Sequence, residues 1–413
     1  MKFNDYNISK EIKRNLADAG FIRPTDIQFK SISSIMKGED VLAIAQTGTG
    51  KTAAFAIPLI NRQHNFKMSK RSSGISCLVM VPTRELARQI GEVFNTIAKG
   101  TRTKVFCLYG GVEQDAQIKR LQDGIDILIA TPGRMFDLIN QGYISLSNIS
   151  VLVLDEADHM LDLGFIDDIK YVKKMLLKKH QTLFFSATIN REIKKLAFAM
   201  VNSNAIRIQI SPEDPVSKNV THYVMFVEMD DKRFFLKRFI DDNPESKILV
   251  FVRTRVRAQR VSDFLKNSGI DSLTIHGEKD QEERNSVLLK FKNGTSRILI
   301  ATDLTARGID IPDINYVINY DLPEKEENYV HRVGRTGRGV RKGSAISYCS
   351  SGEKETLEKI QQFLNKKIEE IRVSKKEYAH TLEKPKEQSL QELIDEHEAW
   401  KKGRKKKKSS LYE

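Results

Sequence analysis

The chain has 413 residues, of which 40% are hydrophobic and 30% are charged, and its formal net charge at neutral pH is +14. This length allows two domains and a tail. Because no long apolar run is present, we expect neither a membrane span nor a signal peptide, but a cytoplasmic protein. The positive charge favours a polyanionic partner. The three cysteines, Cys77, Cys107 and Cys349, lie far apart in apolar runs, which predicts reduced core thiols and not disulfides or metal ligands.

The first informative stretch is residues 20–28, GFIRPTDIQ, which follows an amphipathic helical segment. The amide of Gln28 offers a donor and an acceptor, which can pair with the N6 and N7 edge of adenine, and Phe21 is available to stack on the ring. A helix that starts at the Pro-Thr pair explains the same residues. Taken alone, the stretch is explained more simply by this helix start.

Residues 41–45 are apolar and predict a buried strand, which is followed by QTGTGKT at residues 46–52 and a helix-forming segment. This order is typical of the phosphate-binding pattern G-x-x-x-x-G-K-S/T, with Ala45 in place of its first glycine. Glycines let backbone amides surround phosphate oxygens, Lys51 supplies a positive charge, and the hydroxyl of Thr52 can bind Mg²⁺. The residues predicted to hold the phosphates are Gln46, Thr47, Gly48, Thr49, Gly50, Lys51 and Thr52.

Three more predicted strands, at residues 77–81, 105–109 and 125–130, end in small, hydroxylated or cationic residues. Such side chains and free backbone amides suit the phosphates of a nucleic-acid strand and do not read its bases. A helix cap explains any one of these ends, but three at one edge of a sheet favour a nucleic-acid track. The residues are Pro82, Thr83, Arg84, Gly110, Gly111, Thr131, Gly133 and Arg134.

The sequence VLVLDEAD, which ends at Asp158, joins an apolar strand to three carboxylates. Ligands of an open α/β sheet lie beyond the carboxyl ends of its strands, where Asp155 can hold Mg²⁺ and Glu156 can orient or deprotonate a water. An acidic loop after a core strand is the alternative. The last strand of this half ends in SAT. Its Ser186 and Thr188 can hydrogen-bond Asp158, which would link the nucleotide side to the nucleic-acid side.

Residues 211–218, SPEDPVSK, are polar and contain two prolines, which predicts a linker. After it strands and helices alternate again, with strands expected at 220–227, 248–252, 272–275, 297–301, 316–319 and 345–349. This half has no phosphate loop of its own, so we expect it to act on ATP bound by the first half. The predicted fold is α/β, with two tandem parallel-sheet domains at residues 1–210 and 219–373.

Strand ends in the second half carry further hydroxyl and cationic groups, which can continue the phosphate track. Surface loops and a solvated helix face are the alternative, and for any single group the simpler one. The residues are Arg253, Thr254, His276, Gly277, Gln281, Arg284 and Thr302. Further along, Gly308 permits a close backbone approach, and Asp310 can accept a hydrogen bond from a ribose hydroxyl.

The segment HRVGRTGR, from His331 to Arg338, places arginines among glycines. It is too cationic for a core and too rich in glycine for an ordinary surface helix. The planar guanidinium groups of Arg335 and Arg338 suit a γ-phosphate, and an arginine finger raises a hydrolysis rate by about 10³ to 10⁵. A basic RNA-binding loop is the alternative. We assign His331 to coupling between the two halves. Its partners in this role are Asp158, Ser186 and Thr188 of the first half.

Residues 374–413 are predicted to form a basic tail. Apolar residues at helical spacing, from Leu390 to Trp400, precede the run KKGRKKKK. A cationic tail of this kind is expected to be disordered and to tether RNA through counterion release. A tail that only improves solubility is the alternative.

The chain resembles the DEAD-box RNA helicases in the order of its motifs, which are GFIRPTDIQ, AQTGTGKT, PTRELA, GG, TPGR, DEAD, SAT, ATDLTARGID and HRVGRTGR. The resemblance extends to Arg338 in these motifs and in type to Val373, and Phe3 lies where the family carries an upstream aromatic residue. The sequence INYDLP and the short basic tail look most like the bacterial RhlE-type group. Ala45 and Thr305 are mild departures from the family pattern.

The resemblance implies two RecA-like domains joined by a linker, with ATP and Mg²⁺ in the cleft and single-stranded RNA across both domains. Such a protein is an ATP-dependent RNA helicase that unwinds short duplexes or remodels RNA–protein complexes, coupled to RNA-stimulated ATP hydrolysis, on ribosomal precursors or in RNA decay. The site residues that the resemblance implies are Phe21, Arg23, Thr25 and Gln28 for adenine, Lys51, Asp155, Glu156, Arg335 and Arg338 for catalysis, and Asp310 for the ribose, with Gly308 also in the cofactor site.

The sequence leaves two other classes open. A DNA translocase of the same superfamily would share the ATP motifs, and a comparison of RNA with DNA as stimulators of ATPase activity separates the two. A non-enzymatic RNA-binding scaffold would be expected to lack Lys51, Glu156 or the paired arginines, and all of these are present.

Overall fold

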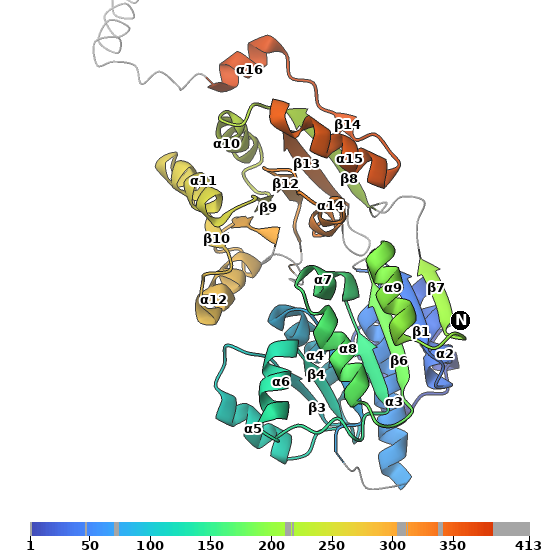
Figure 1. Ribbon diagram of the computed structural model, residues 1–413. Helices are drawn as coiled ribbons and strands as arrows, with labels where there is room; N and C mark the ends of the chain where they lie inside the picture. Colours follow the sequence, from blue (N-terminus) through green and yellow to red (C-terminus); the bar gives the residue numbers. More distant parts are fainter. Residues whose placement is uncertain are drawn as a thin grey trace, which may run out of the picture.

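The computed structural model describes residues 2–45, 48–69, 74–210, 216, 219–303, 311, 313–337 and 342–382. These residues form two α/β domains, which lie one above the other in Figure 1. Each domain contains one seven-stranded sheet, and every strand pairing in both sheets is parallel. This is the tandem parallel-sheet architecture predicted from the alternation of strands and helices.

The sheet of the N-terminal domain has the strand order β3-β4-β2-β5-β6-β1-β7. Its central strands are short apolar runs buried along their whole length, because helices cover both faces of the sheet. The strands are β1 (Val41–Ala45), β2 (Cys77–Met80), β3 (Val105–Leu108), β4 (Ile127–Ala130), β5 (Val151–Leu154), β6 (Gln181–Ser186) and β7 (Ile206–Ile210).

Two apolar clusters, one on each face, fix the helices of this domain to the sheet. The first cluster contains residues of η1 (Phe3–Asp5), α1 (Lys10–Asp18), α2 (Asp26–Met36), α3 (Lys51–Ser69) and α4 (Arg84–Ala98). The second contains residues of α5 (Gln114–Gln122), α6 (Pro132–Asn140), α7 (Ala157–Asp162), α8 (Ile166–Met175) and α9 (Arg191–Met200).

The sheet of the C-terminal domain has the strand order β10-β11-β9-β12-β13-β8-β14, which repeats the order of the first sheet strand for strand. Its strands are β8 (Val220–Phe226), β9 (Ile248–Phe251), β10 (Leu273–Ile275), β11 (Ile298–Ala301), β12 (Tyr316–Asn319), β13 (Gly343–Cys349) and β14 (Glu369–Glu370). Its helices are α10 (Lys232–Asp242), α11 (Arg255–Asn267), α12 (Gln281–Lys292), α14 (Glu326–Val333), η2 (Ser351–Glu353), α15 (Lys354–Leu364) and α16 (Lys375–Leu382).

The parallel strands place all their carboxyl ends along one edge of each sheet. In the N-terminal domain this edge carries the segments after β1, β2, β4 and β5. Figure 1 shows α7, which follows β5, at the boundary with the C-terminal domain. The polar residues that end the strands therefore lie along one edge of the sheet, and those of the DEAD segment face the second domain.

Helix α16 extends the ordered C-terminal domain beyond residue 373, where the tail was predicted to begin. The ring of Tyr378 packs on Phe235 of α10 at a centroid distance of 4.9 Å. Its hydroxyl donates to Asp231 Oδ2 at 2.8 Å and accepts from the backbone N–H of Glu228 at 3.0 Å. A boundary at residue 373 is thus too early, because one aromatic side chain fixes the helix that follows. The basic run at 401–408 lies outside the described residues.

The three cysteines are free thiols, as predicted. Burial raises the pKa of the thiol to about 12 at Cys77 and at Cys107, and to about 11 at Cys349. Thiols of this kind are unreactive at neutral pH, because the reactive form is the thiolate. Within the described part of the chain, no helix combines the length and the apolar character needed to cross a membrane.

Helix α4 approaches β3 closely because it carries Gly91 at the contact. A Cβ at this position would lie 2.1 Å from Cys107 Sγ. The thiol donates a hydrogen bond to the carbonyl oxygen of Ala87, one turn earlier in α4, at 3.4 Å. The glycine therefore sets the distance between the helix and the sheet, and α4 carries at its start the residues predicted to bind RNA.

We predict that Gly91→Ala destabilises the protein, because the added methyl group overpacks this contact. The free energy of unfolding should fall by about 1–3 kcal/mol, as measured by urea denaturation. Adding Cys107→Ala should remove the clash, and the double variant should be at least as stable as Cys107→Ala alone, since alanine is the better helix former. A Gly91→Ala variant as stable as the parent would contradict this account.

Candidate active site

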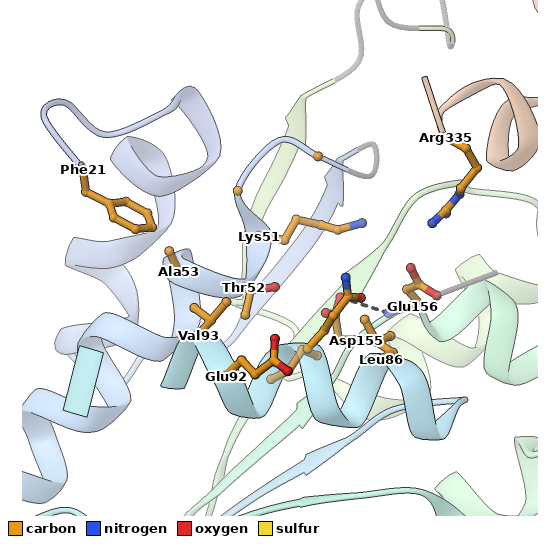
Figure 2. A pocket seen from close by; sticks show the side chains of 14 residues that line it. Phe21, Lys51, Thr52, Ala53, Leu86, Glu92, Val93, Asp155, Glu156 and Arg335 are labelled. Atoms are coloured by element: carbon orange, nitrogen blue, oxygen red, sulfur yellow. Dashed lines mark hydrogen bonds between the residues drawn. The ribbon is translucent and has the colours of Figure 1, made fainter. Parts of the chain in front are cut away.

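A cavity of about 350 Å³ lies between the two domains. Figure 2 shows Lys51, Asp155 and Glu156 of the N-terminal domain at one side of it and Arg335 of the C-terminal domain pointing toward Glu156 from the other. The cavity is lined by Phe21, Gly48, Gly50, Lys51, Thr52, Ala53, Leu86, Gln89, Ile90, Glu92, Val93, Asp155, Glu156 and Arg335. Predicted site residues from four separate segments thus line one space.

The phosphate loop lies between β1 and α3, as its sequence predicts. Gly48 and Gly50 have φ angles of +82° and +92°, which residues with a side chain rarely adopt. The ammonium group of Lys51 donates to the carbonyl oxygen of Ala45 at 2.8 Å, so it lies across the loop. Gln46 and Thr47, also predicted to belong to this loop, lie outside the described residues.

The segment before α2 braces this loop. Thr25 and Gln28 form a capping box at the start of α2, in which Gln28 Oε1 accepts from the backbone N–H of Thr25 at 3.0 Å. Gln28 Nε2 donates to the carbonyl oxygen of Gly50 at 3.1 Å, and Thr25 Oγ1 donates to that of Thr49 at 2.8 Å. Both ends of the amide predicted to recognise adenine therefore have protein partners here. The helix-start interpretation holds for this pair, while Phe21 lines the cavity.

Asp155 and Glu156 follow β5 and are both buried. Burial, reinforced by the neighbouring carboxylates and opposed by Lys51, raises the pKa of Asp155 to about 6. Burial alone would also raise the pKa of Glu156, but the hydrogen bond and charge of His159, with the charges of Arg335 and Lys51, lower that pKa to about 2. Glu156 has a left-handed backbone, with φ at 51°, and caps α7. Two adjacent carboxyl groups thus have pKa values on opposite sides of their usual range.

Asp158 connects the N-terminal domain to the C-terminal one. Its Oδ2 accepts from the backbone N–H of Thr188 at 3.0 Å and from the Thr188 hydroxyl at 2.9 Å. His331 Nε2 of the C-terminal domain lies 3.6 Å from the same oxygen. Burial would raise the pKa of Asp158, but His331, Lys51 and Thr188 hold it well below its usual range. Ser186, predicted to bond Asp158 directly, donates instead to the carbonyl oxygen of Thr188 at 2.8 Å.

The residues predicted to form the nucleic-acid track in the N-terminal domain lie close together. A Cβ at Gly111 would lie 1.9 Å from Arg84 Nη1, and one at Gly110 would lie 3.4 Å from Arg84 Nη2, so this arginine lies across both glycines. Arg134 Nη1 donates to Gln117 Oε1 at 2.8 Å. Thr83 accepts from the backbone N–H of Leu86 and caps α4, so the helix-cap interpretation also holds.

A cavity of about 400 Å³ in the C-terminal domain is lined in part by residues predicted to continue the nucleic-acid track. It is lined by Arg253, Arg255, His276, Gly277, Glu278, Thr302 and Asp303. Thr254 caps α11 by accepting from the backbone N–H of Arg257 at 3.2 Å, as Thr83 does for α4. Burial lowers the pKa of His276, so its ring is neutral at neutral pH.

Besides the contact of His331 with Asp158, two ion pairs between described residues join the domains. Arg284 Nη2 lies 2.7 Å from Glu85 Oε1, and both side chains are largely buried. Lys325 Nζ donates to Asp162 Oδ1 at 2.7 Å at a more exposed position. The sequence identified Arg284 as a phosphate ligand and missed Glu85, whose adjacency to Arg84 was the available signal.

The sequence also missed a buried pair behind the second cavity. Arg332 is 2% exposed, and its Nη2 donates to Asp303 Oδ2 at 2.8 Å while its Nη1 donates to Asn319 Oδ1 at 3.3 Å. It therefore joins α14 to β12 and to the segment that follows β11. Gly308, Asp310 and Arg338 lie outside the described residues, and so does the side chain of Gln281.

Known protein families match both domains that form this site. Residues 25–196 match the family model of the DEAD/DEAH box helicases, and residues 231–340 match that of the helicase conserved C-terminal domain. The chain is 38% identical over 367 residues to the DEAD-box ATP-dependent RNA helicase RhpA of Helicobacter pylori, covering 89% of this chain and 73% of that protein. The chain belongs to the DEAD-box ATP-dependent RNA helicases. This confirms the family predicted from the motifs.

Other relatives carry the same family name. The chain is 37% identical to the DEAD-box ATP-dependent RNA helicase CshA of Bacillus subtilis, with coverage of 90% of this chain and 74% of that protein. It is 40% identical over 380 residues to the ATP-dependent RNA helicase DeaD of Buchnera aphidicola. That match covers 92% of this chain but 62% of DeaD, so the relative is considerably longer.

Solved helicase structures share the fold of both domains. S. cerevisiae Dbp5 bound to RNA and ADP BeF3 aligns with a TM-score of 0.81 and 29% identity, over 92% of this chain and all of that one. Mss116 bound to single-stranded RNA and UDP-BeF aligns with a TM-score of 0.82 and 28% identity, over 93% of this chain and 82% of that one. The predicted fold class, two tandem RecA-like domains, is confirmed.

We predict that Thr188→Val destabilises this helicase, because buried Asp158 then loses one of its hydrogen bonds without a change in side-chain shape. The free energy of unfolding, measured by urea denaturation, should fall by about 1–3 kcal/mol. Thr188→Ser keeps the hydroxyl and should lie closer to the parent. Equal losses for the two variants would show that packing of the threonine, and not its hydrogen bond, supports the site.

Proposed function

We propose that this helicase binds single-stranded RNA across both domains and, coupled to RNA-stimulated ATP hydrolysis, locally separates short duplexes or remodels RNA–protein complexes. The observation that supports this most directly is the composition of the cavity between the domains. Lys51, Asp155 and Glu156 come from one domain and Arg335 from the other. A site divided in this way is complete only while the domains are together.

The N-terminal domain supplies the groups that bind the phosphates. Gly48 and Gly50 open the loop so that backbone amides can face phosphate oxygens, and Lys51 adds a point charge. Phe21 at the cavity wall is placed to stack on the base. Thr25 and Gln28 hold the phosphate loop in place by donating to the backbone carbonyl oxygens of Thr49 and Gly50.

Glu156 orients the attacking water and does not need to act as a strong base. A pKa of about 2 keeps it ionised at neutral pH but makes it a weak proton acceptor. Phosphoryl transfer passes through a loose transition state, in which positioning and charge stabilisation contribute most of the rate. Arg335 supplies that charge stabilisation from the C-terminal domain, with Arg338 proposed as its partner.

Thr52 and Asp155 fit a magnesium ion that arrives with the nucleotide. Both line the cavity, and both offer the hard oxygen ligands that Mg²⁺ prefers. Within the described residues no group of three or more histidine, cysteine or acidic side chains could hold a metal by itself. That fits Mg²⁺, which usually takes one or two carboxylates and completes its shell with phosphates and water. When bound, the ion would neutralise charge on the phosphates.

RNA would lie along the polar strand ends of both domains. Arg84 with its two glycines and Arg134 offer phosphate contacts in the first domain, and the cavity around Arg253 and Thr302 offers them in the second. Asp158, held by Thr188 and facing His331, links the nucleotide side to this track. ATP and RNA then each favour the closed arrangement, and each raises the affinity for the other.

The finer assignments stay predictions. They are membership of the RhlE-type group, a cytoplasmic location, action on ribosomal precursors or in RNA decay, and RNA tethering by the basic tail. The placement of the linker at residues 211–218 is also a prediction, because most of it lies outside the described residues.

The test of the proposed function is ATP hydrolysis by the full chain with single-stranded RNA, with DNA of the same sequence and with neither. We expect RNA to stimulate hydrolysis strongly and DNA to do so weakly. Stimulation by DNA alone would identify a DNA translocase, and ATP-independent RNA binding without hydrolysis would identify a scaffold.

We predict that Arg335→Lys keeps nucleotide affinity but removes most RNA-stimulated turnover, because lysine lacks the planar fork that holds a phosphate with two hydrogen bonds. The loss of kcat should be on the order of 10³, and Arg338→Lys should act in the same way. Arg260→Lys, at an exposed site on α11, is the control. Equal losses of nucleotide affinity and turnover would contradict the role given to Arg335.

We predict that the affinity for the magnesium complex of the nucleotide falls at acidic pH. The metal needs the carboxylate form of Asp155, whose pKa burial raises to about 6, so protonation competes with the metal below that pH. Affinity should drop by up to about tenfold per pH unit below 6, as measured by titration with a fluorescent nucleotide. Asp155→Asn controls for titration of the nucleotide itself, and parallel pH profiles for parent and variant would contradict the prediction.

A further inference from the structure

We propose that His159 is a positioning residue for Glu156, which it holds by a hydrogen bond from Nδ1 to one carboxylate oxygen. This inference deepens the proposed function and rests on it, since it concerns the group that orients the attacking water. His159 is the residue directly after the DEAD sequence, and its ring is 1% exposed. It does not line the cavity, so it would act only through Glu156.

The geometry of α7 brings the two side chains together. Glu156 caps the helix with a left-handed backbone, and His159 lies three residues later, on the same face of the first turn. His159 Nδ1 lies 3.4 Å from Glu156 Oε2. An ionised carboxylate can only accept hydrogen bonds, so Nδ1 must be the donor.

The carboxylate of Glu156 needs a fixed partner because two cations line the same cavity. Lys51 and Arg335 both lower its pKa through their charge, and either of them attracts it. A carboxylate that turned toward Lys51 or Arg335 would no longer face the water it has to orient. His159 approaches from the buried side and occupies Oε2, which leaves the other oxygen for a water in the cavity.

A purely structural role for His159 makes a different prediction. Its neighbours Ala157 and Met160 belong to the second apolar cluster of the N-terminal domain, and the ring of His159 could simply fill space there. In that case any side chain of similar size would serve. A positioning role instead requires a donor at the place of Nδ1, whatever the rest of the side chain.

Asparagine and leucine separate these roles, because they are nearly the same size and shape. The side-chain nitrogen of asparagine occupies the place of Nδ1, while leucine has a methyl group there. In the full chain with RNA, His159→Leu should lower kcat by about 10- to 100-fold, with KM for ATP and RNA affinity almost unchanged. His159→Asn should recover most of kcat. If leucine impairs folding, His159→Met removes the donor with a more adaptable side chain.

A double-mutant cycle with Glu156→Gln completes the test. Once the carboxylate is removed, His159→Leu should cause no further loss of kcat, since its effect passes through Glu156. Equal losses for the leucine and asparagine variants, unchanged kcat in the leucine variant, or additive losses in the cycle would each overturn the proposal. A parent protein without RNA-stimulated hydrolysis would overturn the proposed function itself, so the two failures are distinguishable.

Discussion

The constraint on which this structure depends is the burial of three carboxylates within four residues, Asp155, Glu156 and Asp158. A charge removed from water is costly unless cations or donors compensate it. The N-terminal domain supplies part of this compensation through Lys51 and Thr188, and the C-terminal domain adds His331 and Arg335. Contact between the domains therefore helps to neutralise the carboxylates of the DEAD segment. The same contact completes the active site.

The three carboxylates receive unequal compensation of their charge, and this difference gives them different roles. Asp155 is the least compensated, so its pKa is raised and it is ready for a further cation, as a metal ligand should be. Glu156 and Asp158 have lowered pKa values because each has a histidine partner. They stay ionised at neutral pH, one facing the cavity and the other joined across the domains. One short segment thus contains three carboxylates with three different tasks.

The sequence predicted the fold and most of the site because these depend on local patterns. An apolar run predicts a buried strand. A glycine-lysine loop or an acidic group directly after it predicts a binding site at the end of that strand. Contacts between segments that are distant in the chain could not be predicted from such patterns. The bond from Gln28 to Gly50 and the packing of Gly91 on Cys107 both join segments that lie far apart in the chain, at a separation that no local pattern predicts.

Lys51 shows why such contacts matter for the chemistry. Its ammonium group donates to the carbonyl oxygen of Ala45 across the phosphate loop. An ammonium group has three donors, so Lys51 can bind a phosphate and keep its hydrogen bond to the loop. The alanine in place of the first motif glycine takes part in this contact through its backbone carbonyl, which any residue at the position would offer.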